Sequence, residues 1–179
     1  MFSKPDQNVA QLGLREGMRV ADFGSGTGAY SLSAGRRVGH TGHVYSIEVQ
    51  KSLVKKLESE IKDSGVKNVE CIWGDIEKIH GTKIADHSMD AVIIANVLFQ
   101  AEDKLGLIDE ARRILKKDGK VLFIDWLSSF SGMGPSSEHV IEPKMATDLF
   151  IKRGFKLQEK ITTSPHHYGI IFTHSHESR

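Results

Sequence analysis

One stretch decides the fold of this chain: Val20-Ala21-Asp22-Phe23-Gly24-Ser25-Gly26-Thr27-Gly28-Ala29-Tyr30. Apolar residues lead into an aspartate, and three glycines then alternate with small polar residues before a helix-compatible segment begins. This order predicts a strand, a tight turn and a helix, with a turn so bare of side chains that a ligand can approach its backbone closely. We interpret the turn as the binding loop for a nucleoside-containing cofactor, and the loop alone leaves two such cofactors open.

The composition is that of an ordinary globular protein. The chain has 179 residues, of which 39% are hydrophobic and 26% charged, so it can bury a substantial core without disulfides. The formal net charge of +1 gives no global field that would draw the chain to nucleic acid. Cys71 is the only cysteine, which excludes an intramolecular disulfide and a multi-cysteine metal site, and we expect no metal. No run of about 18 apolar residues occurs, so we expect no membrane span and a cytoplasmic location.

Strand-like and helix-like segments alternate along the whole chain. The strand-like segments are residues 18–23, 43–49, 69–73, 90–96, 120–126, 155–162 and 168–174, and the helix-like ones are residues 5–14, 29–38, 50–63, 103–117 and 143–153. Such alternation predicts an α/β fold with a doubly wound, mostly parallel sheet and a ligand site at its carboxyl edge. The last two strands have a short connection and must therefore be antiparallel to each other.

We expect one domain over residues 1–179, without an internal linker. It begins with a helical segment at residues 1–17, and residues 128–142, which are rich in Ser and Gly, form a loop on the substrate side.

The glycine loop also fits the dinucleotide fingerprint G-x-G-x-x-G/A. Gly24, Gly26 and Ala29 fill its fixed positions, and Glu48 lies about twenty residues beyond the loop. An NAD(P)-dependent oxidoreductase is therefore one reading of the sequence.

Three carboxylates at successive strand ends favour S-adenosylmethionine instead. Asp22 precedes the turn, where a pyrophosphate would meet a negative charge but the ammonium of a methionine group would find support. Glu48 ends the second strand, where it can accept hydrogen bonds from the ribose hydroxyls, and Asp75 ends the third, where it can accept from an adenine amino group. Together they suit a cationic nucleoside.

The segments around these carboxylates, and two further segments, resemble those of a known protein family. The matching segments are residues 22–28, 45–48, 74–76, 90–98 and 110–126. They resemble the class I S-adenosylmethionine-dependent methyltransferases, and most closely the small members similar to the quinone-biosynthesis methyltransferases. The resemblance covers roughly the whole chain and implies a Rossmann-like seven-stranded sheet in the order 3-2-1-4-5-7-6, with strand seven antiparallel and helices on both faces.

The resemblance also implies roles for individual residues. Gly24, Gly26 and Gly28 would contact the methionine portion of the cofactor, and Glu48 the ribose. The Asn96 carbonyl would help to hold the ammonium, and adenine would lie against Asp75 and Ile76. We also expect five further positions to contribute to the cofactor pocket: Phe23, Ser25, Tyr30, Val49 and Gly74. Many relatives carry histidines where this chain has Phe99-Gln100, so no role of those histidines can be transferred.

The methyl acceptor should bind beyond strands four and five and beneath the final turn. The candidates for acid–base chemistry there are Asp125, His166, His167 and Tyr168. Each has a structural alternative, because strand ends and turns are often polar for reasons of solvation. The balanced charge favours a small-molecule acceptor over nucleic acid, while a protein or RNA acceptor, the atom that is methylated and a homodimeric state all stay open.

Overall fold

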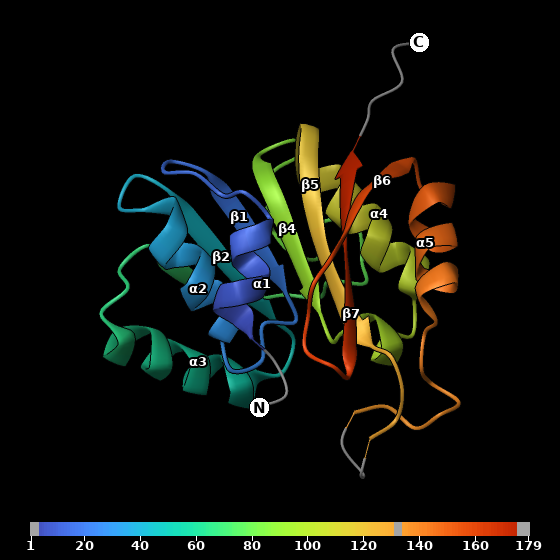
Figure 1. The fold of residues 1–179 in the computed structure, drawn as a ribbon. Helices are drawn as coiled ribbons and strands as arrows, with labels where there is room; N and C mark the ends of the chain where they lie inside the picture. The colour runs from blue at the N-terminus through green and yellow to red at the C-terminus, as the bar shows by residue number, and fades with distance from the viewer. Residues whose placement is uncertain (1–3, 131–133, 175–179) are drawn as a thin grey trace.

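The computed structural model describes residues 4–130 and 134–174, and these form a seven-stranded sheet in the order β3-β2-β1-β4-β5-β7-β6 (Figure 1). β7 pairs antiparallel with both β5 and β6, and every other neighbouring pair is parallel. This topology confirms the doubly wound fold and the strand order that the resemblance implies. The strands are β1 (Arg19–Phe23), β2 (His43–Glu48), β3 (Val69–Trp73), β4 (Met89–Ala95), β5 (Leu115–Trp126), β6 (Phe155–Ile161) and β7 (His167–His174).

Helices cover both faces of the sheet, and each face has its own hydrophobic core. The core beneath α4 and α5 centres on Phe123 and Phe150, and the other core, beneath α1, α2 and α3, on Val20 and Ile93. None of the helices in the described ranges is long and apolar enough to cross a membrane. The helices are α1 (Pro5–Gln11), α2 (Ala29–Val38), α3 (Lys51–Ser64), α4 (Lys104–Ile114) and α5 (Pro143–Lys152), with a 3₁₀ turn, η1 (Leu98–Gln100), after β4.

Two helices are shorter than the sequence pattern predicts. The expected N-terminal helix ends at Gln11, and the expected helix over residues 103–117 ends at Ile114 because Leu115 already pairs with Met89 of β4. Leu115 is fully buried there, and the left-handed backbone of Asp118 (φ 62°) together with Gly119 then forms an irregular stretch before regular pairing resumes. Pairing with β4 thus overrides the helical periodicity of this segment.

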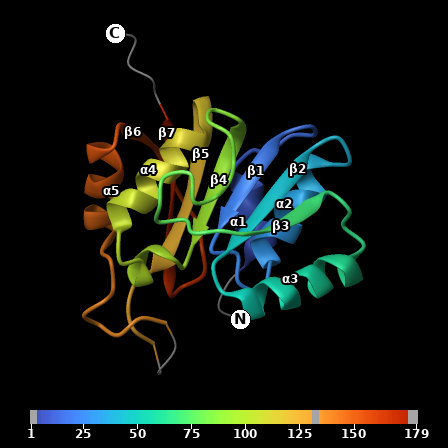
Figure 2. The ribbon, with the colours of Figure 1, turned by 180° about the vertical axis from the view of Figure 1, so that it is seen from behind.

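The connection between β3 and β4 contains no helix. Within the described ranges no helix lies over β1, β2 and β3 on the face seen in Figure 2, where this connection crosses as a loop. The buried carboxylate of Glu110 on α4 fixes the loop, because it accepts hydrogen bonds from the backbone amides of His80 and Thr82 (2.9 and 3.2 Å) and from Arg113 (Nε, 2.7 Å). This anchoring matters for the site, because residues 74–78 of the same connection line or flank the cleft described below.

Replacing Glu110 should therefore destabilise the fold. Glu110→Ala leaves buried amides and the Arg113 guanidinium without their acceptor, and we expect it to lower the free energy of unfolding by about 3 kcal/mol. The pKa of Glu110 lies below its ordinary value: burial would raise it, but hydrogen bonds from Arg113, Thr82 and the His80 amide outweigh that effect. The stabilisation by the carboxylate is thus present above its unfolded pKa of 4.5 and lost as pH falls through the lower folded pKa.

Urea denaturation of the wild type and the variant, at neutral and at acidic pH, measures both effects. Glu60→Ala, an exposed carboxylate on α3, is the matched control and should change little. A loss below about 1 kcal/mol for Glu110→Ala would contradict the anchoring role.

Candidate functional site

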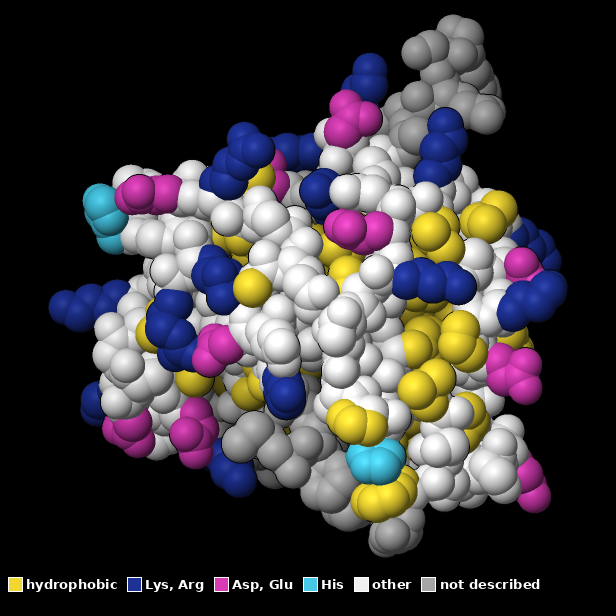
Figure 3. All heavy atoms as spheres, viewed as in Figure 1, with side chains coloured by type: hydrophobic (Ala, Val, Ile, Leu, Met, Phe, Trp, Pro, Cys, Tyr) yellow, Lys and Arg dark blue, Asp and Glu magenta, His cyan; other side chains and the backbone are white. Residues whose placement is uncertain are grey.

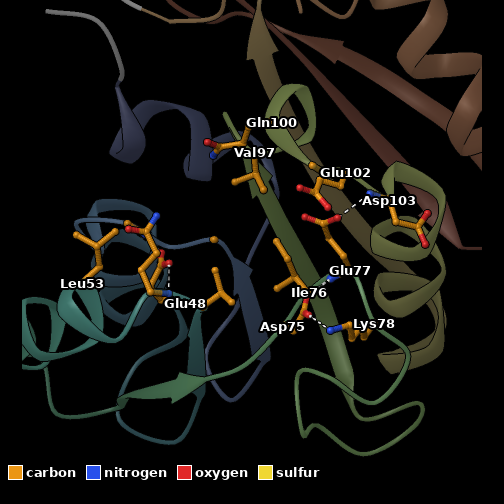
Figure 4. A pocket seen from close by; sticks show the side chains of 15 residues that line it. Glu48, Leu53, Asp75, Ile76, Glu77, Lys78, Val97, Gln100, Glu102 and Asp103 are labelled. Atoms are coloured by element: carbon orange, nitrogen blue, oxygen red, sulfur yellow. Dashed lines mark hydrogen bonds and ion pairs between the residues drawn. The ribbon is translucent and has the colours of Figure 1, made fainter.

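A cleft of about 680 Å³ opens at the carboxyl ends of β1, β2, β3 and β4. Figure 4 shows Glu48 and Leu53 on one side of it and Ile76, Glu77 and Glu102 on the other. This is the edge at which a doubly wound sheet binds its ligand. The cleft is lined by Gly24, Gly26, Glu48, Val49, Gln50, Leu53, Asp75, Ile76, Glu77, Lys78, Val97, Gln100, Ala101, Glu102 and Asp103.

The glycine loop forms the floor of the cleft through backbone that only glycine adopts easily. Gly24, Gly26 and Gly28 have φ angles of 65°, 52° and 80°. A Cβ on Gly24 would lie 2.7 Å from the Val97 side chain, and one on Gly28 would lie 2.3 Å from Leu57. A Cβ on Gly26 would instead meet little protein, since its nearest neighbour is the Gly24 carbonyl oxygen at 4.0 Å. Gly26 is therefore bare on the side where a ligand would lie.

The Glu48 carboxylate joins the glycine loop to the turn after β2. One oxygen accepts from the Gly26 amide (3.2 Å) and the other from the Gln50 amide (2.9 Å). Glu48 also lines the cleft, so the position that the resemblance gives it, beside a ribose, is compatible with its observed surroundings. Each carboxylate oxygen keeps acceptor capacity for a ligand hydroxyl.

Asp75 places a charged carboxylate on the wall of the cleft opposite Glu48 (Figure 4). It accepts from the Glu77 amide (3.0 Å) and pairs with the Lys78 ammonium (3.0 Å). Burial opposes ionisation of Asp75, but the hydrogen bonds from Lys78 and the Glu77 amide hold the pKa of this carboxyl below its ordinary value. Next to it, the largely buried Ile76 adds an apolar surface.

Asp22 lies beneath the glycine loop and outside the cleft lining. Its side chain is buried and accepts a hydrogen bond from the Ser31 hydroxyl (2.6 Å), which in turn lies 2.5 Å from the Ser46 hydroxyl. Burial, with a smaller contribution from the negative charge of Glu48, raises the pKa of Asp22 to about 7 against the lowering effect of the hydrogen bonds from Ser31. Its expected contact with a cofactor stays a prediction.

Several other expected cofactor residues support the cleft from behind instead of lining it. Phe23 is fully buried in the core under α4 and α5, and Tyr30 accepts from the Asn8 side chain on α1 (2.9 Å). The Ser25 amide donates to the Ile47 carbonyl (3.1 Å) and the Gly74 amide to the Glu48 carbonyl (3.1 Å), so both fix the loops.

Asn96 also lies behind the lining, at the turn after β4. Its backbone is left-handed (φ 58°), and its amide donates to the Ile124 carbonyl (2.9 Å). Its neighbour Val97 lines the cleft. Whether the Asn96 carbonyl holds a ligand ammonium stays a prediction.

The structure adds cleft residues that the sequence analysis did not assign. Three of them, Gln50, Glu77 and Val97, directly follow residues that were assigned, so for these adjacency to a strand end was the available signal. Leu53 carried a different signal, because its apolar helical position indicated core packing. These additional residues are Gln50, Leu53, Glu77, Lys78, Val97, Ala101, Glu102 and Asp103.

The charge of the lining is strongly one-sided. Five of its residues carry carboxylates and only Lys78 carries an ammonium. The positive end of α4 offsets part of this charge, since the Asp103 amide donates to Glu77 (2.6 Å) and the Gly106 amide to Asp103 (2.8 Å). A cleft of this kind favours a cationic ligand and disfavours a pyrophosphate.

The candidate acid–base residues lie where the end of β5 meets the start of β7, but on two faces of the sheet. Asp125 and Tyr168 are paired in register on the face covered by α4 and α5, whereas Trp126 and His167 are paired on the other. Tyr168 donates its hydroxyl hydrogen bond to the Ile141 carbonyl (2.8 Å) and so ties down the loop after β5. Burial, together with the charge of Asp125, raises the pKa of Tyr168 far above neutral pH.

Asp125 combines complete burial with an unpaired oxygen. Its Oδ1 accepts from the Trp126 amide (2.9 Å), and its Oδ2 has no hydrogen-bond partner in the part of the chain that the structure describes. Burial raises the pKa of Asp125 to about 7, against the lowering effects of the Trp126 and Phe99 amides and of Lys104. Phe99 adjoins the cleft residue Gln100, so Asp125 lies directly behind this wall of the cleft.

The two histidines of the final turn differ in their surroundings. The His166 ring lies 3.8 Å from the Phe130 ring. His167 is buried, its Nδ1 is hydrogen-bonded to the Ser164 hydroxyl (2.8 Å), and its ring lies 4.3 Å from the Trp126 ring. Burial, with a smaller contribution from His166, lowers the pKa of His167 below its ordinary value.

No group of three or more possible metal ligands is found among the described residues. The expectation of a metal-free site is not tested by this observation.

Comparison with known families gives one match over most of the chain. The family described as "Methyltransferase domain" matches residues 14–162.

Curated relatives match over a shorter region. The ubiquinone/menaquinone biosynthesis C-methyltransferase UbiE of Idiomarina loihiensis is 30% identical over 115 residues, which are 64% of this chain and 45% of that protein. The enzyme of the same name from Pseudomonas putida is 33% identical over 64% of this chain and 44% of its own length. The match thus spans less than half the length of these relatives.

Solved structures match over nearly the whole chain. A SAM-dependent methyltransferase from Aquifex aeolicus has a TM-score of 0.87 and 26% identity, and the match covers 96% of this chain and 90% of that one. A protein described as a putative type 11 methyltransferase, from Sulfolobus solfataricus, has a TM-score of 0.78 and 22% identity, and the match covers 100% and 96% of the two chains. The second likeness shows the fold alone.

The contrast between Gly26 and Gly28 gives a test of the cleft. A methyl group on Gly26 would occupy the ligand side of the loop, so Gly26→Ala should weaken binding of S-adenosylhomocysteine more than tenfold while costing about 1–2 kcal/mol of stability for its left-handed backbone. Gly28→Ala should cost more stability, because its Cβ collides with Leu57. Calorimetric titration and thermal melting measure the two effects, and unchanged affinity in Gly26→Ala would show that the ligand lies elsewhere.

Proposed function

This chain belongs to the methyltransferase-domain family, and on that premise we propose that it transfers a methyl group from S-adenosylmethionine to a small-molecule acceptor. S-adenosylmethionine is the cofactor that this membership implies. The observation that carries the proposal is the cleft itself, in which a left-handed glycine loop faces carboxylates from two neighbouring strand ends.

The parts of the cleft fit the parts of the cofactor. The amides at the start of α2 suit its carboxylate, Glu48 suits the ribose hydroxyls, and Asp75 with Ile76 suits adenine. The acidic lining favours the cofactor's sulfonium and ammonium. The same lining disfavours the pyrophosphate of NAD(P), so the oxidoreductase reading loses its support.

The reaction is a displacement at carbon. The acceptor atom forms a bond to the methyl carbon as the carbon–sulfur bond breaks, and sulfur keeps the electron pair of that bond and becomes a neutral thioether. Because the sulfonium already activates the carbon, holding donor and acceptor in line supplies much of the acceleration. A base is needed only where the acceptor must lose a proton.

We assign the acceptor to the region where the end of β5 meets the final turn. The loop after β5 folds back over this region, since a Cβ on Gly134 would lie 2.6 Å from the Trp126 ring and the Ile141 carbonyl binds Tyr168. A region partly covered by this loop fits a compact acceptor. On the face shown in Figure 3, side chains of both charges are interspersed, which is unlike a nucleic-acid-binding surface.

The relatives named for quinone biosynthesis support a small organic acceptor of this general size. Because the match spans less than half of their length, their own acceptor is not assigned to this chain.

Ligand-induced stabilisation tests the cofactor. At about 100 times its dissociation constant, S-adenosylhomocysteine should raise the melting temperature by roughly 5 °C or more, and NADH should not. Gly26→Ala is the control, because its weaker binding should reduce the shift to about half or less at the same ligand concentration. A shift with NADH and none with S-adenosylhomocysteine would overturn the proposal. If the cofactor is confirmed, a panel of candidate acceptors can be screened for release of S-adenosylhomocysteine from S-adenosylmethionine to identify the substrate class.

We propose Asp125 as the proton acceptor for substrates that must be deprotonated. Once an acceptor is found, Asp125→Asn should reduce turnover by about 100-fold or more. Because the pKa of Asp125 is raised from 3.8 to about 7 on folding, the protonated carboxyl stabilises the fold fully below about pH 3.8, and this stabilisation is lost as pH rises from there to 7. The variant should therefore unfold with roughly 2–4 kcal/mol more free energy than the wild type at about pH 8.5, and this difference should shrink steadily towards about pH 3.5.

If Asp125→Asn is more stable than the wild type at alkaline pH but turns over more slowly, the loss of turnover cannot come from a weakened fold. That combination would assign Asp125 a chemical role and not a structural one. Unchanged turnover in Asp125→Asn would remove this residue from the mechanism. Asp63→Asn, an exposed carboxylate on α3, is the control for both measurements.

A further inference from the structure

We propose that Trp73 is a positioning residue for the adenosine side of the cleft, acting through the turn that follows β2. The inference rests on the proposed function, because it requires that the cleft binds S-adenosylmethionine. Nothing in the resemblance or the family match assigns a role to this residue.

Trp73 lies at the end of the edge strand β3, opposite Glu48 in the register of the sheet. It is 48% exposed, so core packing does not account for a tryptophan at this position. Its indole Nε1 donates a hydrogen bond of 2.8 Å to the backbone carbonyl of Val49. This contact crosses from β3 to the residue that directly follows Glu48.

Two lysines hold the indole in place. The Lys51 ammonium, on the first residue of α3, lies 4.2 Å from the ring centroid, and the Lys83 ammonium lies 5.2 Å from it. Lys83 also donates to the Trp73 carbonyl (2.6 Å) from a left-handed backbone (φ 61°). Cation–π contacts of this kind restrict the rotation of an otherwise exposed ring.

The turn that Trp73 holds is part of the cleft. Val49 is 54% exposed and lines the cleft, and Glu48 and Gln50 on either side of it line the cleft as well. Gln50 is the N-cap of α3 but makes no side-chain capping bond. The turn is therefore fixed by the Glu48 carboxylate from one side and by the Trp73 indole from the other.

The hydrogen bond thus orients the Val49 side chain before a ligand arrives. Val49 and Ile76 line the cleft from the ends of neighbouring strands, so together they can present apolar surface to a planar base. Without the indole N–H, the Val49 carbonyl loses this partner and the turn must be ordered when the ligand binds. The loss should therefore appear in ligand affinity more than in the stability of the free protein.

The test compares binding of S-adenosylhomocysteine to the wild type and to Trp73→Phe, which keeps a ring under the lysines but has no donor. The dissociation constant should rise about three- to tenfold, with a fall of less than about 3 °C in the melting temperature of the free protein. Should Trp73→Phe prove unstable, replacement of Trp73 by benzothienylalanine removes only the N–H and should give the same loss of affinity. An unchanged dissociation constant in both variants would overturn the inference.

A double-mutant cycle with Val49→Ala separates positioning from general destabilisation. If Trp73 acts through Val49, the double variant should bind within about twofold of Val49→Ala alone, whereas additive losses would overturn the inference. Met145→Ala, an exposed apolar residue on the distant helix α5, is the matched control and should bind as the wild type does. Failure of the wild type itself to bind S-adenosylhomocysteine would overturn the proposed function and this inference together.

Discussion

The Glu48 carboxylate is the contact on which the geometry of the cleft depends. Its two oxygens bond the amides of Gly26 and Gln50, and so tie the turn after β1 to the turn after β2. Glycine at the first turn makes this bridge possible, because the left-handed backbone of Gly26 would strain any residue with a Cβ. A single buried acid therefore fixes two loops and remains available to a ligand.

The rest of the cleft is built by extending this bridge to the next strand. The Gly74 amide bonds the Glu48 carbonyl and the Trp73 indole bonds the Val49 carbonyl, which brings the end of β3 into the same framework. Glu110 then fixes the connection from β3 to β4, where a doubly wound sheet would ordinarily place a helix. The cleft is thus supported by hydrogen bonds between loops, and these replace the packing that a helix would supply.

Charge gives the cleft its chemical preference. Carboxylates dominate the lining, while the carboxylates with raised pKa values, Asp22 and Asp125, lie behind it. The lining carboxylates face the cleft in which we propose that a cationic cofactor binds, and Asp22 and Asp125, whose pKa values are raised to about 7, are shielded from it. Such a separation allows one sheet edge to bind a cation and still keep a carboxyl that can exchange a proton near pH 7.

The sequence by itself determined the alternation of strands and helices, the glycine loop and the placement of Glu48 and Asp75 at strand ends, because these depend on local pattern and on the geometry of parallel strands. It failed at residues 115–117, where pairing with Met89 overrides helical periodicity. It also grouped Asp125, His167 and Tyr168, which the alternation of side chains along β5 and β7 divides between two faces of the sheet. Only the tertiary structure decided which polar groups face the cleft and which lie buried behind it, because burial and cross-strand contacts are not local properties of a sequence.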